Sequence, residues 1–168
     1  EVEKGFAGSN DQDGGVGRRV FGTFLRWLQD RPDGVFVIAT ANDVTSLPPE
    51  FFRKGRVDEV FFLDLPNTPA RRAILEVHLR RRGHDPDAFP VEQLAEGTAG
   101  FSGSELEAAV VAGMYRALEG PGTLTPRLLA EELARTVPLA ASRAEDIHRL
   151  RQWAQGRTRP AASLSPVA

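Results

Sequence analysis

The sequence contains no cysteine among its 168 residues, and this absence excludes a disulfide framework and a thiolate metal site. Long apolar runs are also missing, because none approaches the roughly 20 residues that a helix needs to cross a bilayer. No basic and then apolar signal segment opens the chain. We therefore expect a cytoplasmic protein with no membrane partner and no metal ligands of its own.

A strong charge of either sign is lacking as well. The formal net charge is −2, which argues against a protein whose main role is to coat nucleic acid. Hydrophobic residues make up 41% of the chain, a share typical of soluble globular proteins. The length allows one ordinary domain or two small ones. Because the chain opens with Glu-Val-Glu-Lys and not with Met, we expect it to be a piece of a longer protein.

A short apolar run, Val35 to Ala39, is the feature around which the rest is arranged. It is rich in β-branched residues, and the turn residues Asp33 and Gly34 precede it. Such a run predicts a strand that is buried on both faces of a parallel sheet. Ligands of these sheets bind beyond the carboxyl ends of the strands, where Asn42 lies. The Asn42 amide could orient a water or a phosphate oxygen, or it could simply end the strand.

Helical spacing of apolar residues accounts for most of the remaining chain. We expect a helix from Val16 to Asp30 that packs against the first strand, and a second strand from Val60 to Leu63. Further helices are expected from Pro69 to Gly83, from Pro90 through Leu94, behind a Ser102–Glu105 capping box, from Thr125-Pro126, and behind a second capping box at Ser142 and Glu145. Arg71 is expected on an exposed helix face, and the residues from Gly156 onward are expected to be disordered.

These patterns predict an α/β part followed by an all-helical part. The expected boundaries are 1–65 for the α/β part, 66–140 for the helical part, and 141–168 for a last helix and tail. Two strands do not make a stable parallel sheet alone, so the remaining strands are expected upstream of residue 1.

Several motifs occur in an order that resembles the AAA ATPases. The stretch from Leu47 to Asp58, with its Arg-x-Gly-Arg, looks like the second region of homology of that family. Gly100-Phe101-Ser102-Gly103-Ser104-Glu105 looks like its lid motif, and the opening Glu1 to Phe6 looks like the continuation of an Asp-Glu metal motif. The chain is similar in particular to the AAA proteins of cyanobacterial and some plastid genomes.

The resemblance implies the C-terminal half of a P-loop nucleotide-binding core followed by an all-α lid. It further implies ATP and Mg²⁺ as cofactors in the intact protein, a homo-oligomer in the form of a hexameric ring, and remodelling of a protein or nucleoprotein partner. The sequence has no Gly-x-x-x-x-Gly-Lys-Ser/Thr loop to cradle phosphates, so we expect this chain to be inactive alone. The alternatives are a non-catalytic module that docks on a complete ATPase, and a clamp-loader or helicase-loader type of ATPase that acts on nucleic acid.

The resemblance assigns catalytic roles to residues before and around the two expected strands. Glu1 corresponds to the carboxylate that polarises the attacking water, and Asn42 to the sensor-1 residue. Arg53 and Arg56 correspond to arginine fingers, for which a permanently charged, forked guanidinium is well suited. The alternative for the pair is an exposed basic turn in which Gly55 allows a tight bend.

In the lid, the resemblance assigns nucleotide contacts to His78, Gly103 and Ser104. His78 could lie near the ribose or adenine, or it could be a core histidine. Gly103 and Ser104 could let the backbone approach the base, or they could serve only the helix start. The basic stretch from Arg143 to Arg159 could bind RNA or DNA, although a solvated helix face is the simpler interpretation.

Overall fold

The computed structural model describes residues 2, 16–120 and 122–161. The chain divides into two compact units. The first unit holds Glu1–Phe62 and Gln152–Arg159, and the second holds Leu63–Arg151 and Pro160–Ala168. The expected C-terminal segment at 141–168 is therefore shared between the two units.

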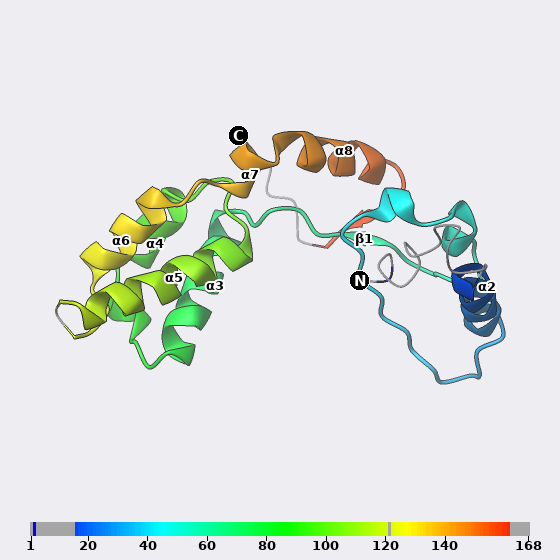
Figure 1. Ribbon diagram of the computed structural model, residues 1–168, viewed down its shortest axis with the longest axis horizontal. Coiled ribbons are helices and arrows are strands. Elements are labelled where there is room, and N and C mark those ends of the chain that lie inside the picture. Colours follow the sequence, from blue (N-terminus) through cyan, green and yellow to red (C-terminus); the bar gives the residue numbers. More distant parts are fainter. Residues whose placement is uncertain (1, 3–15, 121, 162–168) are drawn as a thin grey trace. The chain divides into compact units, whose positions relative to one another are not determined.

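Helices are the longest regular elements of both units (Figure 1). In chain order the elements are α2 (Val16–Gln29), the 3-10 turns η2 (Val44–Ser46) and η3 (Pro49–Phe52), β1 (Phe61–Phe62), α3 (Thr68–Arg81), η4 (Pro86–Ala88), α4 (Val91–Glu96), α5 (Gly103–Leu118), α6 (Pro126–Arg135), α7 (Leu139–Ser142), α8 (Ala144–Ala154) and β2 (Arg159–Pro160). The helices predicted from apolar periodicity between residues 16 and 135 are confirmed.

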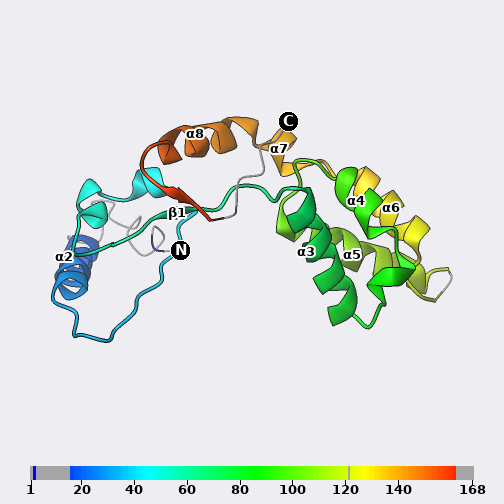
Figure 2. The same cartoon turned by 180° about the vertical axis from the view of Figure 1, so that it is seen from behind.

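The second unit is built around α5, which packs against both α3 and α6, while α4 packs against α3. Figures 1 and 2 both show α3 and α5 side by side. Leu75, Leu79, Leu106 and Leu129 have no exposed surface and form the centre of the core. Apolar side chains at helical spacing therefore find their partners within this unit.

Three helices of the second unit, α3, α5 and α6, start at ends that a side chain caps. The Ser102 hydroxyl accepts from the Glu105 amide at 3.3 Å, and the Glu105 carboxylate accepts from the Ser102 amide at 2.7 Å. The Thr125 hydroxyl accepts from the Leu128 amide at 3.3 Å at the start of α6. Both caps were predicted, and they satisfy amides that have no partner inside the helix.

In the first unit, α2 buries Leu25 and Leu28 against Leu47 and Phe51. Beside this cluster, the short strands β1 and β2 pair with each other (Figure 2), and the Arg159 amide donates to the Val60 carbonyl at 2.9 Å. The end of α8 and the return to β2 thus belong to the same unit as α2 and η3.

The predicted buried strand at Val35–Ala39 is wrong. The segment forms no strand, and the exposed fractions of Phe36 and Ile38 are 88% and 80%. A central strand requires ladder partners on both edges, and β1 with β2 is the sheet that the described residues form. Helix α2 consequently packs on η2 and η3 and their flanks, and the second predicted strand shortens to Phe61–Phe62.

Two predictions near the C-terminus are also wrong. Ser142 does not open a helix with a capping box, because it is the last residue of α7 and α8 begins at Ala144. The residues after Gly156 are not all disordered, because Arg159–Pro160 form β2 and the Thr158 hydroxyl donates to the Ala154 carbonyl at 3.1 Å. Tertiary pairing orders a segment whose own sequence shows no periodicity.

Arg71 is buried rather than exposed, with 6% of its surface accessible. Its guanidinium donates to the carbonyls of Ala95 and Pro66 at 2.9 and 2.8 Å and to the Thr68 hydroxyl at 3.0 Å. Burial lowers the pKa of Arg71 because it disfavours the charged form. The side chain ties the start of α3 to the end of α4, which helical periodicity alone does not reveal.

Candidate functional site

The two candidate finger arginines lie on a short turn between η3 and β1. Pro49 starts η3 with a backbone angle that suits a helix, and Phe51, 5% exposed, anchors the turn in the core of the first unit. Arg53 ends η3 in an extended conformation, and Gly55 then adopts φ +88°, which glycine reaches without strain. The Arg56 amide donates to the Arg53 carbonyl at 3.1 Å and closes the turn. We call residues 49–56 the finger turn.

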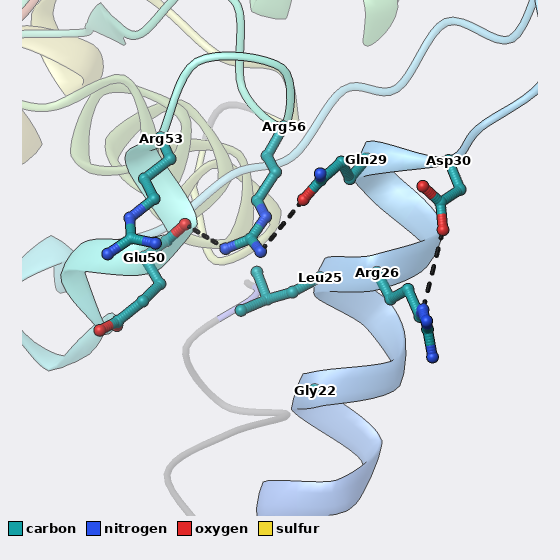
Figure 3. Close-up of a pocket in the computed structure, with 8 residues that line it drawn as sticks. All are labelled: Gly22, Leu25, Arg26, Gln29, Asp30, Glu50, Arg53 and Arg56. Atoms are coloured by element: carbon teal, nitrogen blue, oxygen red, sulfur yellow. Dashed lines mark hydrogen bonds and ion pairs between the residues drawn. The ribbon is translucent and has the colours of Figure 1, made fainter.

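The finger turn borders an open pocket of about 470 Å³ (Figure 3). Its lining consists of Gly22, Leu25, Arg26, Gln29, Asp30, Glu50, Arg53 and Arg56. The lining residues include three arginines and two acids, so guanidinium groups outnumber carboxylates among them. Arg26 lies 3.9 Å from Asp30, so the Arg26 charge is partly compensated.

Arg56 is held in place by its own hydrogen bonds. Its guanidinium donates to the Glu50 carbonyl at 2.8 Å and to the Gln29 side-chain oxygen at 3.3 Å (Figure 3). The Arg56 carbonyl in turn accepts from Arg31 at 3.1 Å. Arg56 therefore connects the finger turn to the C-terminal end of α2.

Arg31 is a supporting residue that sequence reasoning missed. Its side chain, 22% exposed, also donates to the Leu28 carbonyl at 2.8 Å and pairs with Asp58 at 2.6 Å. A basic residue just beyond the end of a helix is well placed to bond the last carbonyls, and this was the available signal. Arg31 thus joins the end of α2 to the last residue of the finger turn and to Asp58, which follows the turn.

Arg53 differs from Arg56 in how its side chain is held. It is exposed, and within the described part of the chain no hydrogen bond or ion pair to its guanidinium is found. Its direction therefore depends on the backbone of the finger turn. The structure brings Arg53 and Arg56 to one pocket.

Asn42, the other candidate residue of the first unit that the structure describes, is exposed and follows the segment at 35–39. Asp43 caps η2, where its carboxylate accepts from the Thr45 amide at 2.9 Å. Glu1 lies outside the described residues. The next residue, Val2, donates its amide to the Thr40 carbonyl at 2.9 Å, two residues before Asn42.

The candidate residues of the second unit lie along the contact between α3 and α5. The His78 ring nitrogen lies 3.4 Å from the Glu107 carboxylate and 3.1 Å from the Arg82 guanidinium. Arg82 donates to Glu107 at 2.8 Å, and this hydrogen bond is the largest cause that lowers the pKa of Glu107. With 13% of its side chain exposed, His78 lies at the edge of the core, in a polar cluster.

Gly103 and Ser104 lie at the start of α5, one turn before Glu107. A Cβ at Gly103 would lie 3.6 Å from Ile74 of α3, an ordinary contact distance. Ser104 is exposed, and its hydroxyl lies 3.0 Å from that of Ser102. His78, Gly103 and Ser104 therefore belong to one seam between two helices.

The basic residues near the C-terminus are largely paired with acids. Arg143 and Arg149 both contact Asp146, at 2.6 and 2.5 Å, and Arg159 pairs with Glu59 at 3.1 Å. This pairing favours a solvated helix face over a nucleic-acid surface. The described residues contain no group of three or more His, Asp or Glu side chains that could hold a metal ion. They also contain no helix that is long and apolar enough to span a membrane.

Comparison with known proteins assigns the chain to a protein family. Residues 1–65 match the ATPase family associated with various cellular activities (AAA). The chain is 42% identical over 156 residues to the uncharacterized AAA domain-containing protein ycf46 of Guillardia theta, covering 92% of this chain and 31% of that protein. The protein of the same name from Pyropia yezoensis is 39% identical over 165 residues, covering 96% and 34%. The ATP-dependent zinc metalloprotease FtsH 1 of Sphaerobacter thermophilus is 39% identical over 109 residues, covering 64% and 16%.

The chain therefore belongs to the AAA family. Within the family it is similar to the cyanobacterial and plastid-encoded type, which confirms the resemblance drawn from its motifs. It spans about a third of the length of the first curated relatives that it matches.

Proposed function

We propose that this chain is the finger-and-lid part of an AAA ATPase that hydrolyses ATP at the contacts between identical subunits. The observation that carries the proposal is the finger turn, which presents Arg53 and Arg56 together at an open pocket. Arg56 is fixed by Glu50 and Gln29, whereas Arg53 is exposed. A fixed and an available guanidinium side by side suit a turn that reaches the phosphates of a neighbouring subunit.

The residues present fit the phosphate end of ATP in part. Bound ATP with Mg²⁺ would supply the phosphoryl group to be transferred. Arg53 and Arg56 would neutralise charge on its phosphate oxygens, and a finger supplied by a neighbour is worth about 10³ to 10⁵ in rate. Asn42 would hold the attacking water, and Glu1 would accept its proton. Because the sequence lacks the phosphate-cradling loop, those contacts must come from residues outside this chain.

The second unit suits the role of a lid over the nucleotide. It has its own core, three of its helices have side-chain caps, and His78, Gly103 and Ser104 lie on one seam that could face a base and ribose. A body of this kind moves as a unit, because its packing has few alternative arrangements. We propose that its movement in a homo-oligomeric, hexameric ring remodels a protein partner.

The test uses the full-length natural protein with Arg53→Ala and Arg56→Ala, singly and together. We expect each single change to lower kcat at least about a hundredfold, and the double change about a thousandfold, because the developing charge loses its partner. Arg26→Ala is the matched control, since Arg26 lines the same pocket but lies beside Asp30. Its kcat should stay within about twofold of the unchanged protein. An unchanged kcat in the double variant would contradict the proposal.

A further inference from the structure

The aromatic residue Phe52 lies immediately before the candidate finger Arg53. It is the last residue of η3, and its half-buried ring contacts two other rings. The centroid of Phe51 lies 5.4 Å away in an edge-on arrangement, and that of Trp153 lies 5.5 Å away at an interplanar angle of 54°. Phe51 belongs to the core under α2, whereas Trp153 comes from the end of α8.

The segment that carries Trp153 is well anchored in the first unit. Ala154, its neighbour, is 6% exposed, and its carbonyl accepts from the amide and the hydroxyl of Thr158, both at 3.1 Å. Arg159 then pairs through its backbone with Val60 at 2.9 Å and through its side chain with Glu59 at 3.1 Å. Contacts at the start and at the end of the turn that follows Trp153 thus anchor this segment.

We infer that Trp153 is a positioning residue for Arg53, an inference that rests on the proposed finger function. Arg56 has its own hydrogen bonds to Glu50 and Gln29, so its place does not require the aromatic pair. Arg53 has no such bond among the described residues, and its direction follows from the backbone at Phe52. The rings of Phe51 and Trp153 both contact the Phe52 ring, and the Trp153 contact therefore adds to the limit on how far that backbone can shift.

The experiment is a set of double-mutant cycles on ATP hydrolysis by the full-length protein. Trp153→Leu should lower kcat about tenfold with the KM for ATP within about twofold, because a displaced finger costs rate rather than ground-state binding. Trp153→Phe, which restores a ring, should remain within about threefold of the unchanged protein. Trp27→Leu is the control, because Trp27 stacks on Phe24 of α2 and lies outside the finger turn.

The cycle separates a positioning role from a structural one. In the Arg53→Ala background, Trp153→Leu should lower kcat by less than about twofold, since the group that it positions is gone. In the Arg56→Ala background the full tenfold loss should remain. An equal loss in both backgrounds, or no loss in the unchanged protein, overturns the inference.

A second variant covers the case in which Trp153→Leu lowers the melting temperature below the assay temperature. Phe52→Leu removes the other ring of the pair and should lower kcat when Arg53 is present but not in the Arg53→Ala background. An equal loss of kcat in both backgrounds overturns the inference. The failure of the proposed function has a different signature. If Arg53→Ala alone leaves kcat unchanged, the proposed finger role is wrong. If Arg53→Ala lowers kcat strongly and Trp153→Leu lowers kcat by the same factor with or without Arg53, only the positioning role of Trp153 is wrong.

Discussion

The two units of this chain differ in the size of the apolar core that each one buries. In the second unit, Leu75, Leu79 and Leu106 are fully buried and the helices around them are capped. In the first unit, Phe36 and Ile38 are 88% and 80% exposed, and the buried cluster is small. The second unit thus has the larger core of buried side chains. The first unit holds its finger turn through a few aromatic contacts and the arginines Arg31 and Arg56.

The largest expected effect tests the core of the second unit. Leu106→Ala removes a fully buried side chain and should lower the free energy of unfolding by about 2–5 kcal/mol, since a cavity remains. Leu118→Ala on the same helix is the control, because Leu118 is 74% exposed and its loss should cost less than about 0.5 kcal/mol. Urea unfolding followed by circular dichroism measures both. An equal loss of unfolding free energy in the two variants would contradict the core described above.

The next effect concerns the buried guanidinium of the second unit. Arg71→Met keeps most of the side-chain volume but leaves the Ala95 and Pro66 carbonyls without their donor. We expect the free energy of unfolding to fall by about 1–3 kcal/mol. Arg72→Met, on the exposed side of the same helix, should change it by less than about 1 kcal/mol, although Arg72 pairs with Glu76 and Glu92. If Arg72→Met costs as much as Arg71→Met, the assignment of faces on α3 is wrong.

A smaller effect concerns acid pH. Hydrogen bonds from Arg127 and Arg116 lower the pKa of Glu131 from its ordinary value of 4.5, and a bond from Arg72 lowers that of Glu76. A carboxylate with a lowered folded pKa stabilises the fold above its unfolded pKa, and this contribution is lost as pH falls through the folded pKa. The melting temperature should therefore decrease as the pH is lowered below about 4.5.

The variant Glu131→Gln should make that fall shallower, because the carboxylate that titrates is gone. Glu119→Gln is the matched control, since Glu119 is exposed and no ion pair of Glu119 occurs in the described part of the chain. Differential scanning calorimetry between pH 6 and pH 3 would follow both variants. The interpretation fails if both variants follow the acid profile of the unchanged chain.

The smallest effect is expected in the first unit. Phe36→Ala in this chain should change the free energy of unfolding by less than about 0.5 kcal/mol, because the ring loses almost no contacts. Phe51→Ala, in the cluster under α2, is the comparison and should cost about 3 kcal/mol or more. A large loss for Phe36→Ala would show that the segment at 35–39 packs as the sequence first predicted.

The difference between the units also explains what could be predicted from the sequence. Helices and caps depend on residues a few positions apart, so α2, α3 and the Ser102–Glu105 box were foreseen. A strand depends on partners that are distant in sequence, and the apolar run at 35–39 says nothing about whether they are present. The burial of Arg71 likewise depends on carbonyls outside its own helix face.

For the candidate site, too, features that depend on neighbouring residues could be predicted and features that depend on distant residues could not. The finger turn was foreseen because Pro49, Gly55 and the two arginines lie within a few residues of one another. The support from Arg31 and Trp153 was not foreseen, because their partners Asp58 and Phe52 lie far along the chain. Short motifs thus indicate candidate groups, whereas the contacts that position these groups are visible only in the fold.

The most direct test of the central claim mixes two inactive variants of the full-length protein. One carries Arg53→Ala with Arg56→Ala and keeps Asn42, and the other carries Asn42→Ala and keeps both fingers. If fingers act on the neighbouring subunit of a head-to-tail ring, about a quarter of the sites in an equal random mixture combine an intact Asn42 with intact fingers. ATP hydrolysis by the mixture should then rise to about that share of the unchanged rate. A mixture that is no faster than the mean of its two components would contradict the account.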